Sequence, residues 1–514
     1  MGQKAYKHQQ GSIQFHDIRL NGGLNYSEAP GNIQDNELTH ALNYIYDPQT
    51  GTPEIRPATL CQTAAVCDST NGILNIYYYE KSSTTAYLVG VCNGNLYYLS
   101  GTGLTAWTKI GALNDKTTVP MFATFHGKLL VADGGTNIKT WDGTTYSALA
   151  DGLGATAITV IKGRVVVNST SSGSADLVTM SGAEDETMWN TADPTNPAIA
   201  LRAGYGDNMV VTGFAVFGDD LFVFKKGTSE KCVYKVNTGD ATAANWYCAM
   251  QTQNNGAQSG HAIVSAFNDV FFMDTYAFKS LRGVTEYGDL QVEQIGAKIN
   301  NAFSAGSTCK MLAYIPYYNA IWFIVGDITY TCTQLVNAGQ KSYVFTELSF
   351  KQGTINAVCQ AGSTIYLAGN NGYLYTLDLT GTYATDETAP DTTSAYTSNL
   401  VTKQFSYFGG FILRKTSLYL DPIVSGTAYL YAVTDLSENI LLKTVTLQSS
   451  GQLLYDATGY LCDATEYLND MGLAAWYEYT RNRVRGSTLQ FKITATSGRV
   501  GIEGLKAEIA LVEG

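Results

Sequence analysis

The sequence predicts an all-β protein whose central part is a β-propeller of about seven irregular blades, with six to eight blades compatible with the pattern. Three observations lead to this fold class. The 514-residue chain contains 51 glycines, 35 tyrosines and only 10 prolines, a composition typical of turn-rich sheets. A module of apolar strands and polar turns recurs along most of the chain. Its period is roughly 35–55 residues, the length of a four-stranded blade.

One copy of the module is MFATFHGKLLVADGGTNIKTWDGTTY, residues 121–146. We expect a strand over residues 121–125 and a tight turn at His126-Gly127, followed by a strongly apolar strand over residues 129–132. A second turn at Asp133-Gly134-Gly135 precedes a third strand. Glycine supplies the positive φ that such turns need, and Asp and Asn tolerate it better than most residues.

Related modules follow one another between residues 61 and 380, the range that we assign to the propeller. Stacking such sheets side by side buries their faces and leaves only short edges. A string of sandwiches or barrels is the alternative all-β arrangement. The seven modules cover residues 75–99, 122–146, 158–180, 214–236, 262–284, 312–345 and 355–377.

Residues 1–60 precede the modules and are expected to form an extended N-terminal arm. A short helix is predicted over residues 34–43, where Asp35 or Asn32 would cap the first turn. An apolar stripe that starts at Leu38 would bury one side of this helix.

Two segments follow the propeller. Residues 381–400 are rich in Thr, Ser and Asp and are predicted to be a linker. Residues 401–514 contain longer alternating strands and are predicted to form a C-terminal β-sandwich-like domain. Its strands are expected over residues 411–420, 426–433, 440–447, 474–479, 488–495 and 501–511.

The charge and the cysteines restrict the class of protein. A net charge of −12 argues against a sequence-wide basic footprint for nucleic acid. It remains compatible with a negatively charged channel through which DNA slides without sticking. The nine cysteines form no CxxC pair and are expected to be buried free thiols, which fits assembly in a reducing cytoplasm. No secretory signal is visible, and no apolar run could span a bilayer, so no membrane insertion is expected.

No motif for catalysis or for metal binding stands out. The five histidines are not paired at metal-ligand spacing, and neither a GxSxG elbow nor an HExxH helix occurs. The acidic groups Glu184-Asp185-Glu186, Asp219-Asp220 and Asp133 are interpreted as solvated turn residues, and so is His126. A pair of carboxylates on facing blades could still make a glycosidase site. We therefore expect a protein that is not an enzyme, with no catalytic, cofactor-binding or metal-binding residues and no cofactor.

One basic cluster stands apart from the acidic background. Arg481, Arg483 and Arg485 alternate along a predicted strand, so their side chains should share one face. They could face DNA phosphates in a symmetric oligomer. Alternatively, they could protect a sheet edge or form ion pairs between subunits.

The arm and the C-terminal hairpins together resemble a known protein family. The arm shows Gly22-Gly23-Leu24-Asn25, Pro30, Ile33, Asp35-Asn36-Glu37, Asn43 and Arg56, and the chain closes with RNRVRGSTLQFKITATSGRVGIEGLKAEIALVEG. This pattern resembles that of the tail proteins of short-tailed bacteriophages known as the tail nozzle, tail tubular protein B or packaged-DNA stabilisation protein.

The resemblance implies a structural virion protein. Members form a hexameric propeller ring below the portal and adaptor, retain packaged DNA, and conduct it during ejection. The expected partners are therefore other copies of the chain, the adaptor, the portal and other tail proteins, with transient non-specific contact to exiting DNA. The expected location is the virion tail, assembled in the host cytoplasm. The alternative function is that of a phage receptor-binding propeller that binds carbohydrate through exposed Tyr and Trp rings, or cleaves it with carboxylates from facing blades.

Overall fold

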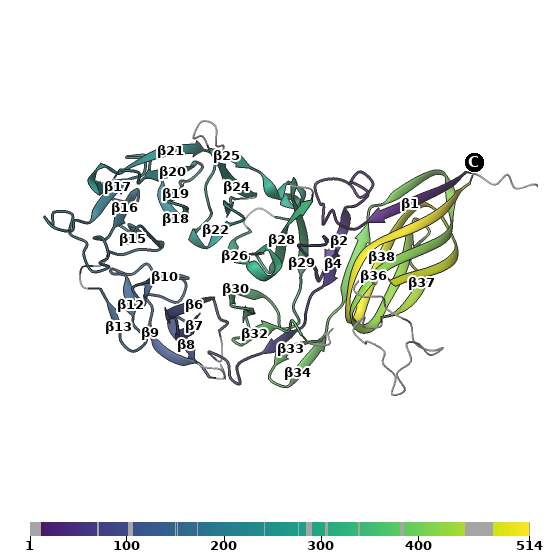
Figure 1. Ribbon diagram of the computed structural model, residues 1–514, viewed down its shortest axis with the longest axis horizontal. Helices are drawn as coiled ribbons and strands as arrows, with labels where there is room; N and C mark the ends of the chain where they lie inside the picture. Colours follow the sequence, from purple (N-terminus) through teal and green to yellow (C-terminus); the bar gives the residue numbers. More distant parts are fainter. Residues whose placement is uncertain are drawn as a thin grey trace, which may run out of the picture.

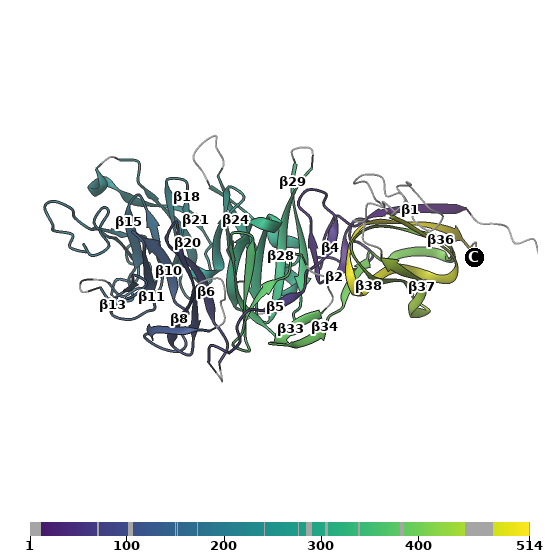
Figure 2. The ribbon, with the colours of Figure 1, turned by 60° about the horizontal axis from the view of Figure 1, so that its bottom comes forward.

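The computed structural model is all-β, with 38 strands and five short 3₁₀ segments among its described residues. A ring of sheets forms the larger part, and a separate stack of long strands adjoins it on one side (Figures 1 and 2). The described residues are 12–68, 71–100, 106–149, 151, 153–171, 173–240, 242–275, 277–283, 290–303, 307–337, 340–380, 385–447 and 476–512.

The ring consists of four-strand meanders that follow one another in the chain. The first three are β6 (Asn75–Ser82), β7 (Thr85–Cys92), β8 (Asn95–Ser100) and β9 (Thr108–Ala112); β10 (Met121–Phe125), β11 (Lys128–Ala132), β12 (Lys139–Trp141) and β13 (Tyr146–Ala148); and β14 (Ile158–Ile161), β15 (Arg164–Asn168), β16 (Leu177–Met180) and β17 (Ile199–Arg202). The next two are β18 (Val210–Phe217), β19 (Asp220–Lys226), β20 (Lys231–Asn237) and β21 (Tyr247–Gln253); and β22 (Ile263–Ala266), β23 (Asp269–Met273), β24 (Phe278–Gly283) and β25 (Leu290–Glu293).

The sixth position holds β26 (Cys309–Ile315), β27 (Ala320–Val325), β28 (Ile328–Asn337) and β29 (Gln340–Leu348). The seventh holds β30 (Ile355–Ala361), β31 (Thr364–Gly369) and β32 (Leu374–Leu377), completed by β5 (Thr59–Cys61). The 3₁₀ segments are η1 (Ala243–Asn245), η2 (Gly260–Ala262), η3 (Ile295–Lys298), η4 (Asn300–Ala302) and η5 (Pro316–Tyr318).

The first strands of the meanders close into a circle. Each of β6, β10, β14, β18, β22, β26 and β30 contacts the next, and β30 contacts β6. The seventh sheet is completed by the N-terminal strand β5, whose Thr59 pairs with Leu377 of β32. The fold is therefore a β-propeller that is closed by a strand from outside the repeat region.

The predicted propeller is confirmed, and the expected modules coincide with the positions of the ring. Six positions are self-contained four-stranded sheets, whereas β26–β29 continues into a larger twelve-stranded sheet. The central strands are apolar because both of their faces are covered: every residue of β15 and of β27 is buried. At the β10–β11 hairpin, His126 and Gly127 both have positive φ, as a two-residue hairpin turn requires.

The arm is a set of strands and contains no helix among its described residues 12–60. Its strands are β1 (Ile13–Arg19), β2 (Leu38–Leu42), β3 (Tyr44–Tyr46) and β4 (Pro53–Ile55). The prediction of a helix over residues 34–43 is therefore wrong. A β-bulge between Leu38 and His40 shifts the alternation by one residue, so that Leu38 and Ala41 are both buried. This spacing of three imitates the apolar stripe of a helix.

The prediction of a linker over residues 381–400 is also wrong for its described part, since residues 381–384 lie outside the described ranges. The segment forms β33 (Thr385–Ala389), β34 (Thr392–Ala395) and the start of β35 (Ser398–Thr402). Its polar composition reflects a hairpin with one buried carboxylate, Asp386, which is fully enclosed.

The C-terminal region is built from β36 (Phe405–Thr434), β37 (Ser437–Leu447) and β38 (Trp476–Leu511). Residues 411–420 lie between residues 476–486 and 502–511, and residues 427–434 lie between β37 and residues 489–497. The long strands β36 and β38 therefore each contribute to two layers, and the two layers share one hydrophobic core. This arrangement is sandwich-like, but it also takes in β1, β2 and β35 from outside residues 401–514. Residues 1–11 and 448–475 of the predicted regions lie outside the described residues.

Candidate interaction surface

The three arginines that the sequence singles out lie on β38 at the end of the molecule away from the propeller. Arg481, Arg483 and Arg485 are exposed, whereas Val484 between them is buried. Asn482 faces the other way and donates a hydrogen bond from Nδ2 to Thr416 Oγ1 at 3.0 Å. The alternation predicted from the sequence therefore places all three guanidinium groups on one solvent-facing side.

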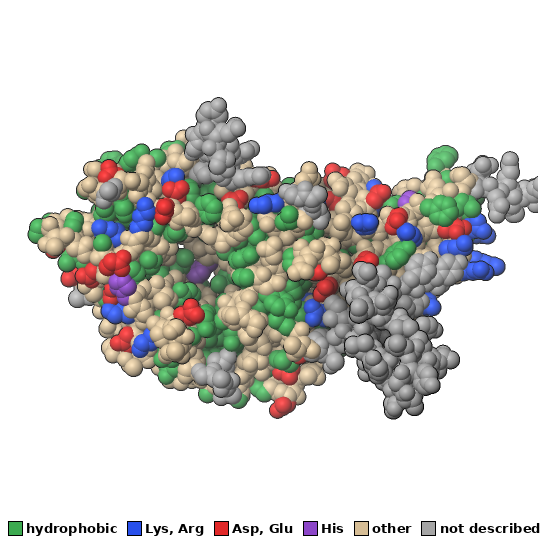
Figure 3. Space-filling view, viewed as in Figure 1, with side chains coloured by type: hydrophobic (Ala, Val, Ile, Leu, Met, Phe, Trp, Pro, Cys, Tyr) green, Lys and Arg blue, Asp and Glu red, His purple; other side chains and the backbone are tan. Residues whose placement is uncertain are grey.

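The side chains of these arginines differ from the paired cations on the adjacent strand. Among the described residues, no ion pair or hydrogen bond is formed by their side chains. By contrast, Arg414 and Lys415 on the adjacent strand share the carboxylate of Glu508, at 3.5 and 3.1 Å. Figure 3 shows Lys and Arg side chains gathered at this end of the molecule.

Apolar side chains accompany the arginines across the same sheet. One row of paired residues runs Phe15, Glu508, Lys415 and Arg481 across four strands. Directly opposed residues project from the same side of a sheet, and Phe15 is 76% exposed. A second row runs Ile13, Ala510, Ile412 and Arg485. We call this surface the arginine face; it is defined by Ile13, Phe15, Ile412, Lys415, Glu508, Arg481, Arg483 and Arg485.

More exposed apolar residues lie at the edge of the arginine face. Phe408, within β36, is fully exposed, and Leu436, in the turn between β36 and β37, is 74% exposed. The backbone next to Phe408 adjoins β38, because a Cβ on Gly410 would lie 3.2 Å from the Gly486 carbonyl oxygen. The turn that contains Leu436 lies against the same part of β38, because Asp435 accepts hydrogen bonds from Ser487. Exposed apolar groups beside unpaired arginines are typical of surfaces that bind another macromolecule.

The arm residues that carry the family resemblance have structural tasks. A Cβ on Gly22 would lie 2.7 Å from the Asn36 carbonyl oxygen, and Gly23 has a φ of +70° directly against Phe345 of β29. Buried Glu37 accepts a hydrogen bond from Asn25 Nδ2 at 2.7 Å and pairs with Lys298 at 2.9 Å. The motif therefore docks the arm onto the propeller.

Arg56 of the same motif forms a fully buried ion pair. Its Nη1 and Nη2 donate to the two carboxylate oxygens of Asp386 at 2.9 and 2.6 Å, and neither side chain is exposed. Its guanidinium group lies 3.9 Å from the centre of the Tyr396 ring, and its Nε donates to Asn43 Oδ1 at 3.0 Å. This pair ties the arm to the β33–β34 hairpin.

Two acidic residues of the propeller, Asp133 and Glu186, are enclosed in ion pairs. Asp133 and Glu186 are buried and paired with Lys139 and Lys128, so interpreting these two as solvated turn residues is wrong. His126 does lie in an exposed turn, where its Nε2 is 2.7 Å from Glu184 Oε2.

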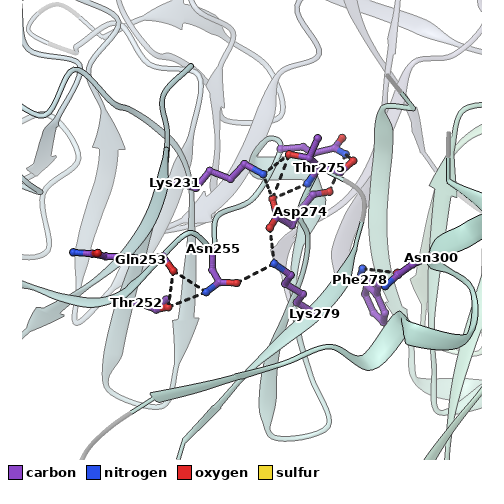
Figure 4. Close-up of polar contacts among 10 residues, drawn as sticks. Lys231, Thr252, Gln253, Asn255, Asp274, Thr275, Phe278, Lys279 and Asn300 are labelled. Atoms are coloured by element: carbon purple, nitrogen blue, oxygen red, sulfur yellow. Dashed lines mark hydrogen bonds and ion pairs between the residues drawn. The ribbon is translucent and has the colours of Figure 1, made fainter. Parts of the chain in front are cut away.

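A cluster around Asp274 joins the fourth and fifth blades (Figure 4). Its carboxylate pairs with Lys231 of β20 and with Lys279 of β24, the latter at 2.6 Å, and Lys279 also donates to Asn255 Oδ1 at 2.9 Å. Burial opposes ionisation of Asp274. The hydrogen bonds from both lysines and from the Thr275 N–H outweigh burial and hold its pKa below the ordinary value.

Two blades also meet across the middle of the ring. His261 of η2, before β22, has its Nε2 3.1 Å from the carbonyl oxygen of Val119, which precedes β10. Burial lowers the pKa of this imidazole, so the neutral form is favoured at neutral pH. At the height of His261, a side chain therefore lies across the central axis of the single propeller.

A polar groove of about 390 Å³ lies between the arm and the C-terminal region. Asp17, Arg19, Tyr419, Glu503 and Lys506 contribute to its walls. Among the described residues, no cluster of three His, Cys, Asp or Glu side chains is arranged to hold a metal ion. Nor does any helix in the described part of the chain have the length and apolarity needed to cross a membrane.

Comparison with known proteins yields structural likeness only. No family model matches the chain, and no curated protein matches it either. The WD40 propeller of Doa1 superposes with a TM-score of 0.39 at 11% identity, covering 62% of this chain and 97% of that one. The Neurospora crassa Pan2 WD40 domain gives 0.41 at 8% identity, covering 63% and 96%, and the computationally designed Ika8 protein gives 0.33 at 12%, covering 62% and 99%. At these scores the likeness adds nothing to the strand pairings, which define the propeller by themselves.

The sequence located the arginines but missed the apolar half of the surface. Ile13 and Phe15 alternate like residues of a buried strand face, and only the pairing of β1 with the end of β38 shows that they are exposed. Phe408 stands before Gly409-Gly410, and an aromatic residue next to this glycine pair was the available signal.

Proposed function

We propose that this protein is a structural, non-enzymatic component of a bacteriophage tail, the nozzle, which forms a ring of identical chains below the portal and adaptor. It is assembled in the host cytoplasm, retains packaged DNA in the virion and conducts it during ejection. The observation that carries the proposal is the arginine face, where three arginines lack an ion-pair partner among the described residues and share the surface with exposed apolar groups that a solitary chain would not need.

Two further features support this proposal. The arm motif that resembles the nozzle family fastens the arm to the propeller and to the β33–β34 hairpin. The hydrogen bond between His261 and Val119 crosses the axis of the single propeller. A passage for duplex DNA would therefore run along the axis of a ring of chains, with each propeller contributing one section of the wall.

Within such a ring the arginine face is a protein-docking surface. Guanidinium groups on the same sheet face as the exposed Phe15 and Ile13 match the composition of interface cores, which are enriched in aromatic residues and arginine. The net charge of −12 would keep DNA contacts weak and transient, as a conduit requires.

The test compares the triple variant Arg481→Ser, Arg483→Ser, Arg485→Ser with a matched control. The control, Lys109→Ser, Lys116→Ser, Lys341→Ser, removes the same charge from exposed positions of the propeller. We expect the wild type and the control to form rings, or to bind a portal–adaptor complex, in negative-stain images and in mass photometry. The arginine variant should lose this assembly while keeping its melting temperature. A wild-type chain that stays monomeric and ignores tail partners would contradict the proposal.

The second candidate is carbohydrate binding, and the groove is the feature that favours it. Tyr419 offers an aromatic surface there, and Asp17 and Glu503 offer carboxylates that could accept hydrogen bonds from sugar hydroxyls. A glycan array and a reducing-sugar assay test this candidate. Binding that Tyr419→Ala abolishes would favour it, whereas binding unaffected by this substitution would reject the groove.

A further inference from the structure

Two cysteines meet where the propeller ring closes. Cys67 lies in the connection from β5, which belongs to the last blade, to β6, which begins the first. Cys92 is the last residue of β7 in the first blade. The Cys92 Sγ lies 3.3 and 3.2 Å from the carbonyl oxygens of Asn71 and Gly72 in this same connection, and Asn93 Nδ2 donates to Asp68 Oδ2 at 3.0 Å. These contacts bring the Cys92 thiol next to that of Cys67. The two cysteines therefore come from the two segments that meet where the ring closes, Cys67 from the connection that leaves the last blade and Cys92 from the first blade.

Each cysteine is fixed to its own side by backbone contacts. The Cys67 N–H donates to the Gly372 carbonyl oxygen at 3.0 Å, in the turn between β31 and β32 of the last blade. The Cys92 backbone is held in the β7–β8 ladder, where it pairs with Asn95. A bond between the sulfur atoms would therefore connect the last blade to the first. Without it, the closure depends on the three-residue strand β5, on side-chain packing and on hydrogen bonds such as that from the Ile73 N–H to the Gly369 carbonyl oxygen at 3.1 Å.

We propose that Cys67 and Cys92 are a disulfide site that closes the propeller ring covalently once the protein leaves a reducing compartment. The oxidant is a low-molecular-weight disulfide of the glutathione class. The inference rests on the geometry of the closure and does not depend on the proposed function.

The chemistry proceeds in two exchange steps. Cys67 is partly exposed and Cys92 is fully buried, so the oxidant meets Cys67 first. The Cys67 thiolate attacks one sulfur of the oxidant, forms a mixed disulfide and releases one reduced thiol. The Cys92 thiolate then attacks the Cys67 sulfur, which forms the Cys67–Cys92 bond and releases the second thiol. Two protein thiols are oxidised, one external disulfide is reduced, and both protons pass to the released thiols.

Burial and the neighbouring Cys92 thiol affect the rate of the first step. The hydrogen bond to Cys92, together with burial, raises the pKa of the Cys67 thiol, so little thiolate is present at neutral pH. Oxidation should therefore be slow at neutral pH and faster under mildly alkaline conditions. The reduced protein would persist throughout assembly in a cytoplasm.

The test uses the full-length protein purified under reducing conditions and then incubated with oxidised glutathione at mildly alkaline pH. We expect the loss of two titratable thiols, a mass lower by two hydrogen atoms, and a Cys67–Cys92 cross-linked peptide after digestion. Since the closed loop is about 25 residues long and the chain has 514 residues, the melting temperature should rise by about 3 °C. A reductant should reverse all of these changes.

Three variants make the result decisive. Cys67→Ser and Cys92→Ser should each abolish the rise in melting temperature, whereas Cys359→Ser, a control in the last blade, should retain it. Should either variant fail to fold, the peptide map of the oxidised wild type decides alone. A glutathione adduct that persists on Cys67, or an oxidised protein in which both thiols remain free, would overturn the proposal.

Discussion

Replacing Asp386 by Asn tests whether the buried ion pair holds the arm in place. The substitution keeps the shape of the side chain but leaves the Arg56 guanidinium enclosed without a counter-charge. Removing one partner of a buried pair costs about 3–5 kcal/mol. Tyr396 and Phe350 still flank the cation, at 3.9 and 4.6 Å, and the Asn oxygen retains one acceptor. We therefore expect the free energy of unfolding to fall by about 3 kcal/mol, near the lower end of this range.

The assay is denaturant unfolding followed by tryptophan fluorescence and circular dichroism, with limited proteolysis of the arm as a local probe. The matched control is Asp35→Asn, which makes the same chemical change in the pair with Lys403, where Asp35 is 69% exposed. Exposed pairs contribute about 0–1 kcal/mol, so this variant should resemble the wild type. A double variant, Arg56→Met with Asp386→Leu, should recover part of the lost stability, because it leaves no unpaired charge. Equal stability of the Asp386 and Asp35 variants would refute the reasoning.

Three other outcomes are expected. The pKa of Asp274 is lower in the folded protein than in the unfolded chain, where it is about 4. Its ion pairs therefore stabilise the protein fully above about pH 4 and lose this contribution as the pH falls through the pKa of the folded state. Asp274→Asn should lower the melting temperature at pH 7 and flatten the acid side of a plot of melting temperature against pH. Gly23→Ala should lower the free energy of unfolding by about 1–3 kcal/mol, because φ is +70° and the added Cβ would lie 2.8 Å from the Phe345 nitrogen. Faster proteolysis of the arm would reveal this loss. Phe408→Ser should leave the melting temperature unchanged but weaken assembly in mass photometry, because the ring contacts only solvent in the single chain.

The repeated strands could be predicted because each module is a local meander. Alternation and turn residues lie within one short stretch, so Leu129–Ala132 and the turn at Gly127 were found without knowledge of distant partners. The same reasoning placed the three arginines on one exposed side of β38.

The misassigned segments depend on distant residues. Leu38 and Ala41 share a buried face only through a bulge that forms against β35. The polar segment around Asp386 looked like a linker because its partner, Arg56, lies about 330 residues earlier. The apolar half of the arginine face likewise requires β1 to pair with the end of the chain. Contacts of such separation leave no periodic trace in the sequence.

Closure of the last blade by β5 has a consequence for how the chain is made. Thr59 emerges from the ribosome early, but its partner Leu377 is synthesised about 300 residues later. At about 5–20 residues per second, the nascent propeller stays open for about 15–60 s. The earlier blades can form as local meanders during this interval, while the edges that flank the gap remain unpaired and prone to wrong pairing. Closure must wait until Leu377 has been synthesised, and the pairing of β1 must wait for residues 504–510 of β38, so the N-terminal strands are among the last parts to acquire their native contacts.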